Sequence, residues 1–205
     1  MRFFFIVFNV FYLVAVTASA TPDPENLRLS EAAQEQVGVT TIYDPSYVGL
    51  DFPNGDIPRA RGVCSDVVIR ALRDAWDIDL QRITNADMKR NFSLYPKIWG
   101  LSRTDRNIDH RRVPNLEVLL KRAGAALDLS TDPNAFQAGD IVSFRLAGSG
   151  LAHIGIINSD MASDGTPLVT HNIGAGTRTE NMLFRHKIVG HFRIGAGARA
   201  WLSAR

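Results

Sequence analysis

The chain has 205 residues, a formal net charge of +2 and 45% hydrophobic residues, which suits one globular domain after a short N-terminal segment. A charge so close to zero gives no electrostatic basis for binding nucleic acid, so we expect no nucleic acid partner. The sequence contains no internal repeat and no heptad run, which argues against solenoid and coiled-coil architectures.

The first twenty residues carry the pattern of a secretory signal peptide. Met1-Arg2 supplies a positive charge, residues 3–16 are almost entirely apolar, and Ala18-Ser19-Ala20 offers the small residues at which signal peptidase cleaves. An uncleaved membrane anchor is the alternative, because the apolar run approaches the roughly 20 residues of a membrane span. We therefore expect an exported protein, periplasmic or extracellular, that meets a membrane only through an uncleaved leader.

Helices are expected in the first half of the chain. Residues 21–41 are polar with two prolines and are interpreted as a leader or linker. From Val63 to Ala75 the apolar residues recur at helical spacing, which predicts an amphipathic helix packed on a core. Shorter helices are expected over residues 85–92 and 115–123, with a polar, arginine-rich loop at 100–114 between them.

Strands are expected in the second half, where the hydrophobic period changes to two. The expected strands cover residues 140–144, 151–157, 168–171 and 188–194. Because helices precede strands without alternating, and the strand connections are short, we predict an α+β fold with an antiparallel sheet. The domain should span residues 42–195, and residues 196–205 should form a C-terminal tail.

Cys64 is the single cysteine of the chain. An exported protein with one cysteine has no intramolecular disulfide, so the thiol is either a buried structural group or a reactive one. Cys64 stands in the first turn of the expected helix, where unpaired backbone N–H groups and the helix dipole stabilise a thiolate. Arg59 and Arg61 lie just upstream and would add positive charge. This position favours a reactive nucleophile.

A thiol nucleophile needs a base and a group that orients the base. His153 begins the second expected strand and shares one face with Gly155, a residue that leaves room for close approach. His171 ends the third strand, and if these strands form a hairpin it can orient His153 as the third member of a catalytic triad does. Asn172, on the opposite face, is the alternative orienting residue.

The two histidines also have other interpretations. His153 at a strand start is compatible with a structural role, and His171 with a bond to a loop carbonyl. A zinc site of His153, His171 and Cys64 is a further alternative. Zinc takes three or four ligands, usually at tighter sequence spacing, so we expect no metal and no other cofactor.

Several motifs resemble those of known families. The Gly62-Val-Cys-Ser65 start of a core helix, the Gly139-Asp140 strand and the histidine strand 153–157 resemble papain-fold cell-wall peptidases of the NlpC type. Over residues 42–194 the chain resembles more closely a bacterial domain of unknown function, number 1287. The matching stretches are Tyr43-Asp-Pro-Ser-Tyr47, Pro53-Asn-Gly-Asp56, Arg61-Gly-Val-Cys-Ser-Asp66, Asn107-Ile-Asp-His-Arg111, His153-Ile-Gly-Ile156, His171-Asn-Ile-Gly-Ala-Gly176 and Gly190-His-Phe-Arg193.

The resemblance implies a papain-like domain whose core helix carries the nucleophile Cys64, with His153 as base and His171 as orienting residue. It also implies an assisting tyrosine upstream of the cysteine, for which Tyr47 is the candidate and Tyr43 the alternative. This chain departs from the NlpC pattern in the longer connection between the histidines. It also departs after the cysteine, where Asp66 replaces the more familiar glycine and becomes a candidate for contacting substrate.

Asp109, His110 and Arg111 belong to the arginine-rich loop, and loops are where binding residues gather. Arginine pairs bidentately with carboxylates, and the stem peptides of peptidoglycan carry several. These three residues are therefore candidates for substrate binding. The alternative is a solvated loop in which Asp109 pairs with the neighbouring arginines.

The sequence thus predicts an exported cysteine hydrolase that cleaves an amide bond through a thioester at Cys64. The resemblance and the location indicate cell-wall peptide as substrate, cut by endopeptidase or amidase action. One alternative is a non-catalytic envelope protein of the same fold that binds peptidoglycan or a protein partner. Another is transfer of the acyl group instead of hydrolysis.

Overall fold

The structure, a computed structural model, describes residues 23–204. In chain order its elements are α1 (Pro24–Gln34), β1 (Ile42–Tyr43), β2 (Arg61–Gly62), α2 (Cys64–Trp76), α3 (Leu80–Asn91), η1 (Phe92–Leu94), η2 (Asp109–Arg111), α4 (Val113–Arg122), β3 (Ala126–Leu127), η3 (Pro133–Ala135), β4 (Ile141–Arg145), β5 (Ala152–Met161), β6 (Pro167–Asn172), β7 (Thr177–Glu180), β8 (Lys187–Phe192) and α5 (Ala196–Ser203). The expected signal peptide lies outside the described residues. Within residues 23–204, no helix combines the length and apolar character needed to cross a membrane.

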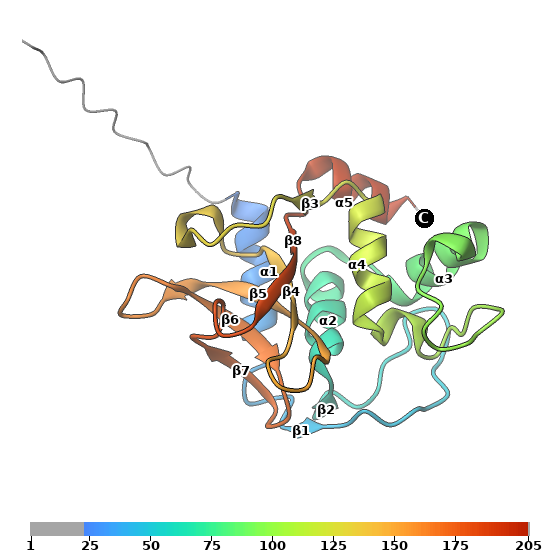
Figure 1. Ribbon diagram of the computed structural model, residues 1–205. Helices are drawn as coiled ribbons and strands as arrows, with labels where there is room; N and C mark the ends of the chain where they lie inside the picture. The colour runs from blue at the N-terminus through green and yellow to red at the C-terminus, as the bar shows by residue number, and fades with distance from the viewer. Residues whose placement is uncertain (1–22, 205) are drawn as a thin grey trace, which may run out of the picture.

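An antiparallel sheet with the strand order β3-β8-β4-β5-β6-β7 lies toward one side of the domain, and α3 and α4 lie toward the other (Figure 1). β4 and β5 form a hairpin, and β6 pairs with the other edge of β5 so that His171 stands opposite Gly155. A second, much smaller pairing joins β1 to β2 in parallel, with Tyr43 opposite Gly62. The predicted α+β class with an antiparallel sheet is therefore confirmed.

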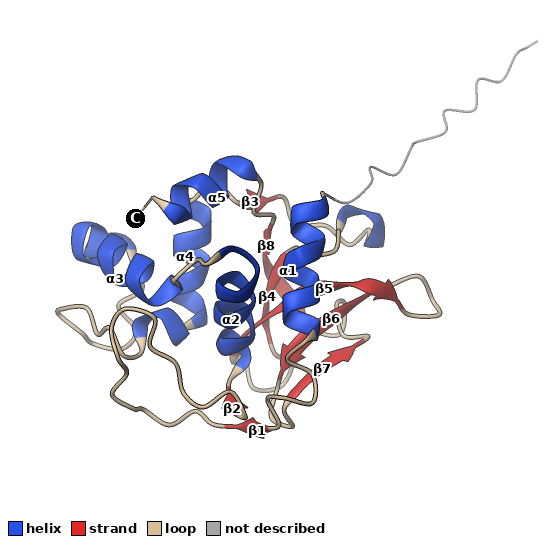
Figure 2. Ribbon diagram, turned by 180° about the vertical axis from the view of Figure 1, so that it is seen from behind, coloured by secondary structure: helices blue, strands red, loops and turns tan. Residues whose placement is uncertain are grey.

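Two helices, α1 and α2, cover one face of this sheet (Figure 2). The apolar side chains of α2, among them Val68 and Leu72, share a fully buried core with Ile154 and Ile156 of β5. Phe144 and Ile157 belong to a second apolar cluster, which contains the strand residues of opposite parity. Since side chains alternate along a strand, these two clusters lie on opposite faces of the sheet.

The helix that carries Cys64 begins where the sequence predicted. Gly62 precedes it, and the backbone N–H of Val63 donates a 2.7 Å hydrogen bond to Oδ2 of Asp66, which satisfies one donor at the start of the helix. The helix ends at Trp76, and Asp77 adopts a left-handed conformation with φ 55°. The core helix carrying Cys64 and packed on the sheet is thus confirmed.

The N-terminal leader is shorter than we expected, because α1 occupies residues 24–34. Asp23 accepts a hydrogen bond from the N–H of Glu25, and Pro24 occupies the first turn, where proline is tolerated. Leu29 and Ala33 are fully buried against α2 and the sheet. The helix escaped prediction because polar residues such as Asn26 share its buried face and weaken the hydrophobic pattern.

The C-terminal tail is also wrong as an expectation, because residues 196–203 form α5. Its Leu202 is fully buried and joins the main core. The folded domain therefore extends beyond both ends of the expected range 42–195, to include α1 and α5. Strand β7 was not predicted, because its residues Thr177–Glu180 are all polar or charged. Helix α3 begins at Leu80, after its capping residue Asp79, five residues before the expected start.

Candidate active site

Cys64 is the first residue of α2, and the small β1–β2 pair holds the chain that leads to it. A glycine suits position 62, because a Cβ there would lie only 3.1 Å from Arg70 and 3.3 Å from Asp66. Cys64 is 7% exposed and packs in the main core. The nucleophile candidate is therefore fixed at a helix start but is almost covered by protein.

Burial raises the pKa of the Cys64 thiol to about 11. The backbone N–H groups of Ile154, Ser65 and Cys64 itself lower this pKa, as expected at a helix start, while the Asp66 carboxylate raises it. Arg59 and Arg61 give no compensation, because they pair with Asp74 and Asp44. The thiol form of Cys64 is therefore favoured, since loss of water outweighs the N–H groups.

The two predicted histidines are brought together across the β5–β6 pair. His153 Nε2 and His171 Nδ1 are 3.1 Å apart, and the rings meet edge to face at 89°. Both residues are 2% exposed. Gly155 permits this approach, because a Cβ on it would lie 2.7 Å from Val169 Cγ1 and 3.1 Å from His171 Cβ. The close approach that we expected at Gly155 is thus made by β6.

Glu180 of β7 extends this series of side chains and was not among the residues predicted from the sequence. Its Oε2 lies 3.2 Å from His171 Nε2. An ionised carboxylate only accepts hydrogen bonds, so His171 Nε2 carries a proton and its Nδ1, in the neutral ring, accepts one from His153 Nε2. His153 Nδ1 is then the ring nitrogen with a free lone pair. In principle, alternation along Thr177–Glu180 would have placed Glu180 on the same face as His171.

Both histidines are held in the neutral form at neutral pH. Burial lowers the pKa of His153 to about 3, with smaller contributions from His171 and His186. Burial also lowers the pKa of His171, although the Glu180 carboxylate opposes this effect. A neutral His153 is the form that can accept a proton.

Asn172 does not contact His153. Its Nδ2 donates to the carbonyl of Gly62 over 3.1 Å, and its Oδ1 accepts from the N–H of Gly174. It therefore ties the end of β6 to the segment that precedes Cys64. Of the two candidates for the orienting position, the geometry brings His171 to the base.

The structure also separates the two tyrosine candidates. Tyr47 is 60% exposed, and its hydroxyl lies 3.1 Å from an Asp105 carboxylate oxygen and 3.0 Å from Asn107 Nδ2. Tyr43 is paired with Gly62, and burial followed by the charge of Cys64 raises its pKa. The tyrosine beside the cysteine is thus Tyr43, and Tyr47, our preferred candidate, faces another part of the surface.

Cys64 and the histidine pair lie near each other but are not bonded. The sulfur faces the backbone N–H of Ile154, the residue after His153. No hydrogen bond between Cys64 and His153 occurs within residues 23–204, and strand alternation turns His153 toward the Phe144 side of the sheet. The same part of the chain contains no group of three His, Cys, Asp or Glu side chains suited to a metal.

The four candidates for substrate contact are internal. Arg111 binds the carboxylate of Asp66 through two hydrogen bonds of 2.9 and 2.8 Å, and both side chains are nearly inaccessible. Asp109 is buried beside Arg112, and burial raises its pKa. His110 is also buried, which lowers its pKa to about 4. Asp66 and Arg111 brace the segment before Cys64, through the Val63 N–H and the carbonyls of Asp44 and Ser46.

The motif residues near the C-terminus form a separate buried cluster. Asp140 is fully buried, and its carboxylate accepts hydrogen bonds of 2.7 Å from both His191 and Arg193. The ring of Phe136 stacks on His191 with 4.3 Å between centroids. This cluster joins β8 to the start of β4, so these motif positions have a structural explanation.

Comparison with known proteins supports a family assignment. A family model described as a domain of unknown function (DUF1287) matches residues 30–194. An uncharacterized protein of Escherichia coli K12, YijF, is 54% identical over 168 residues, which cover 82% of this chain and 81% of the relative. Among solved structures, NlpC1 from Trichomonas vaginalis matches with a TM-score of 0.41 and 14% identity, over 82% of this chain and 44% of NlpC1.

Proposed function

The chain belongs to the DUF1287 family, and we propose that it is a cysteine hydrolase with Cys64 as nucleophile and His153 as base. One observation carries this proposal, the hydrogen-bonded chain from His153 through His171 to Glu180 beside the start of the cysteine helix. A buried histidine whose far nitrogen is held by an acceptor matches what acyl-transfer enzymes require of a general base. A histidine with only a packing role needs no such chain.

The hydrogen-bonded series from His153 to Glu180 gives each side chain a role. Glu180 holds the proton on His171 Nε2, His171 Nδ1 accepts from His153 Nε2, and His153 Nδ1 is left to receive a proton. The imidazolium formed at His153 would donate to His171, whose ring the carboxylate polarises. Glu180 and His171 are therefore positioning residues, while Cys64 and His153 touch the reacting atoms.

The reaction begins from a neutral thiol and a neutral imidazole, because burial raises the pKa of Cys64 to about 11 and lowers that of His153 to about 3. The Cys64 proton passes to His153 Nδ1 as sulfur bonds to the amide carbonyl carbon. The carbon–nitrogen bond then breaks, and His153 returns the proton to the leaving amine. Water attacks the thioester while His153 accepts its proton, and that proton restores the thiol.

For this reaction Cys64 must reach His153, whose ring lies toward the Phe144 face of the sheet. We therefore propose that substrate binding moves the sulfur from the Ile154 N–H past the end of β5 to His153 Nδ1. The backbone N–H of Cys64 is the candidate donor to the oxyanion, since it lies at the helix start. Tyr43 is the tyrosine placed to assist, because its hydroxyl feels the charge of Cys64. Tyr43→Phe should therefore lower turnover.

We propose an amide bond of cell-wall peptide as substrate, cut in the envelope or outside the cell after export through the N-terminal segment. The resemblance of the Cys64 and His153 motifs to NlpC-type peptidases and the signal-like residues 1–20 support this part of the proposal. Mild positive charge is compatible with an anionic wall.

A non-catalytic envelope protein that binds peptidoglycan or a protein partner is the second candidate. The observation in its favour is the buried Cys64, whose raised pKa a binding protein would tolerate without cost to function. The two candidates differ in whether Cys64 ever forms a bond to substrate.

Digestion of purified muropeptides, read by mass spectrometry, separates these candidates. Wild type should generate new fragments, and Cys64→Ala and His153→Ala should generate none while retaining the wild-type circular dichroism spectrum. Free acid products indicate hydrolysis, and a new amide or ester indicates acyl transfer. Failure of wild type to cut any muropeptide, with bound peptide recovered intact, would favour the binding protein.

A further inference from the structure

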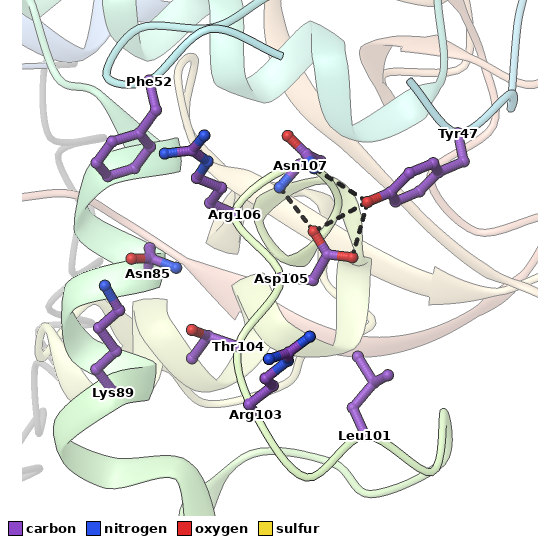
Figure 3. Close-up of a pocket in the computed structure, with 10 residues that line it drawn as sticks. All are labelled: Tyr47, Phe52, Asn85, Lys89, Leu101, Arg103, Thr104, Asp105, Arg106 and Asn107. Carbon is purple, nitrogen blue, oxygen red and sulfur yellow. Dashed lines mark hydrogen bonds between the residues drawn. The ribbon is translucent and has the colours of Figure 1, made fainter. Parts of the chain in front are cut away.

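A cavity of about 560 Å³ lies between α3 and two loops, residues 47–52 and 101–107 (Figure 3). Cys64 and the two histidines are not among the residues that line it. The connection to the cysteine runs along the chain, since Tyr43 is beside Cys64 and Tyr47 lines the cavity. Cα atoms four residues apart are separated by at most about 14 Å, so the cavity rim is within reach of one bound peptide.

The cavity walls are held in place by hydrogen bonds between the two loops and α3. Asn107 accepts from the N–H of Leu50 over 3.0 Å and donates to the Tyr47 hydroxyl over 3.0 Å. Gln81 of α3, fully buried, donates to the carbonyls of Asp51 and Arg106. A cavity whose walls are bonded to one another is preformed, which lowers the entropy cost of binding a ligand.

Three cationic side chains line this cavity without a carboxylate partner. Within residues 23–204, Lys89, Arg103 and Arg106 form no ion pair and no side-chain hydrogen bond, although Arg106 packs over the ring of Phe52 at 5.5 Å. Most other arginines of the described chain are paired with aspartate or glutamate. The one lining carboxylate, Asp105, is already engaged by Tyr47 and by the N–H of Asn107.

Asn85 adds an unused polar group. It is 5% exposed, lines the cavity from α3, and its side-chain amide makes no hydrogen bond within the described part of the chain. Figure 3 shows this amide directed into the cavity between Lys89 and Arg106. The amide is accessible from the cavity, so a ligand there can bond to it without displacing a protein partner.

We propose that this cavity binds a carboxylate of an acidic peptide, with Lys89, Arg103 and Arg106 as the anion-binding groups and Asn85 bonding the peptide. Arginine and lysine supply charge-assisted hydrogen bonds to carboxylates, and Phe52 and Leu101 offer apolar surface to short side chains. The inference rests on the proposed function only in taking that peptide to be the substrate. The arginine-rich loop thus contacts ligand through residues 103–106, upstream of the 109–111 segment that the sequence indicated.

Calorimetric titration tests this site with the Cys64→Ala protein, which holds peptide without cleaving it. The probe is the tripeptide Ala-Glu-Ala with free carboxylates, compared with Ala-Gln-Ala amide. The acidic peptide should bind, and its amidated analogue should bind at least about tenfold more weakly. Arg106→Gln and Lys89→Gln should each weaken the acidic peptide about tenfold, and higher salt should weaken it further.

Arg185→Gln is the matched control, because Arg185 is an exposed arginine far along the chain that lines no part of the cavity. Equal binding of the amidated peptide, or equal weakening by Arg185→Gln, would overturn the proposal. Displacement of the peptide by inorganic phosphate at equal concentration would also overturn it, since the site would then be a general anion site. Peptide that binds here but is not cut by wild type would leave this site standing and remove the proposed hydrolase.

Discussion

Arg111→Met should destabilise the protein strongly, because it leaves the carboxylate of Asp66 buried without its partner. The guanidinium of Arg111 bonds both Asp66 oxygens and also donates to the carbonyls of Ser46 and Asp44. The two side chains are only 3% and 4% exposed. Removing one partner of a buried ion pair costs about 3–5 kcal/mol.

For a domain of this size, each kcal/mol lowers the melting temperature by about 2–4 °C. The expected loss for Arg111→Met is therefore about 6–20 °C, measured by circular dichroism at 222 nm. Arg61→Met is the matched control, since Arg61 is 55% exposed in its pair with Asp44 and exposed pairs contribute about 0–1 kcal/mol.

A double-mutant cycle separates the ion pair from other effects of the substitution. Asp66→Asn keeps an oxygen for the Val63 N–H but removes the charge that needs Arg111. The double variant should therefore lose clearly less stability than the sum of the single variants. A melting temperature within about 2 °C of wild type for Arg111→Met would refute this reasoning. An effect confined to KM would then return Arg111 to the role of a substrate-binding residue.

Three further predictions concern helix α5, the hydrogen-bonded series from His153 to Glu180, and stability in acid. Leu202→Ala should lower the free energy of unfolding by about 2–5 kcal/mol in urea titration, because α5 belongs to the core, and an unchanged midpoint would contradict that placement. Glu180→Gln should lower kcat about tenfold or more and move the acid limb of the pH–rate profile to lower pH. The reason is that a charge that raises the pKa of His171 is lost. A pH–rate profile like that of wild type would leave Glu180 without a part in proton transfer. The pKa of His110 is lowered to about 4, so stability is lost as pH falls from about 6.5 through 4, by up to about 3 kcal/mol from this residue. His110→Leu should reduce that slope, and an unchanged slope between wild type and variant would contradict the assignment.

The elements with regular hydrophobic periods were predictable from the sequence. The helix from Cys64 and the strands that carry His153 and His171 have apolar residues on one clear face, and each lies close to its expected position. Helix α1 and strand β7 were not predictable in this way, because tertiary packing decides their conformation. Short polar strands and helices with polar residues on the buried face carry no strong period.

At the candidate site, the sequence could indicate residue types, but not how burial shifts their pKa values or which partners they bind. A helix start and nearby arginines suggested a thiolate at Cys64, yet the burial that raises its pKa depends on packing from distant segments. In the sequence, Arg111 cannot be distinguished from any other loop arginine. Only the fold brings it to Asp66, 45 positions away. Glu180 could have been proposed as a partner of His171 only after β7 was recognised.

Covalent trapping tests the central claim most directly. The protein is mixed briefly with muropeptides, quenched in acid and examined by intact-mass and peptide-mapping mass spectrometry. The account predicts a hydroxylamine-sensitive acyl group on the peptide that contains Cys64, absent from Cys64→Ala. Fragments released with the acyl group on another residue, or released equally by Cys64→Ala, would contradict it.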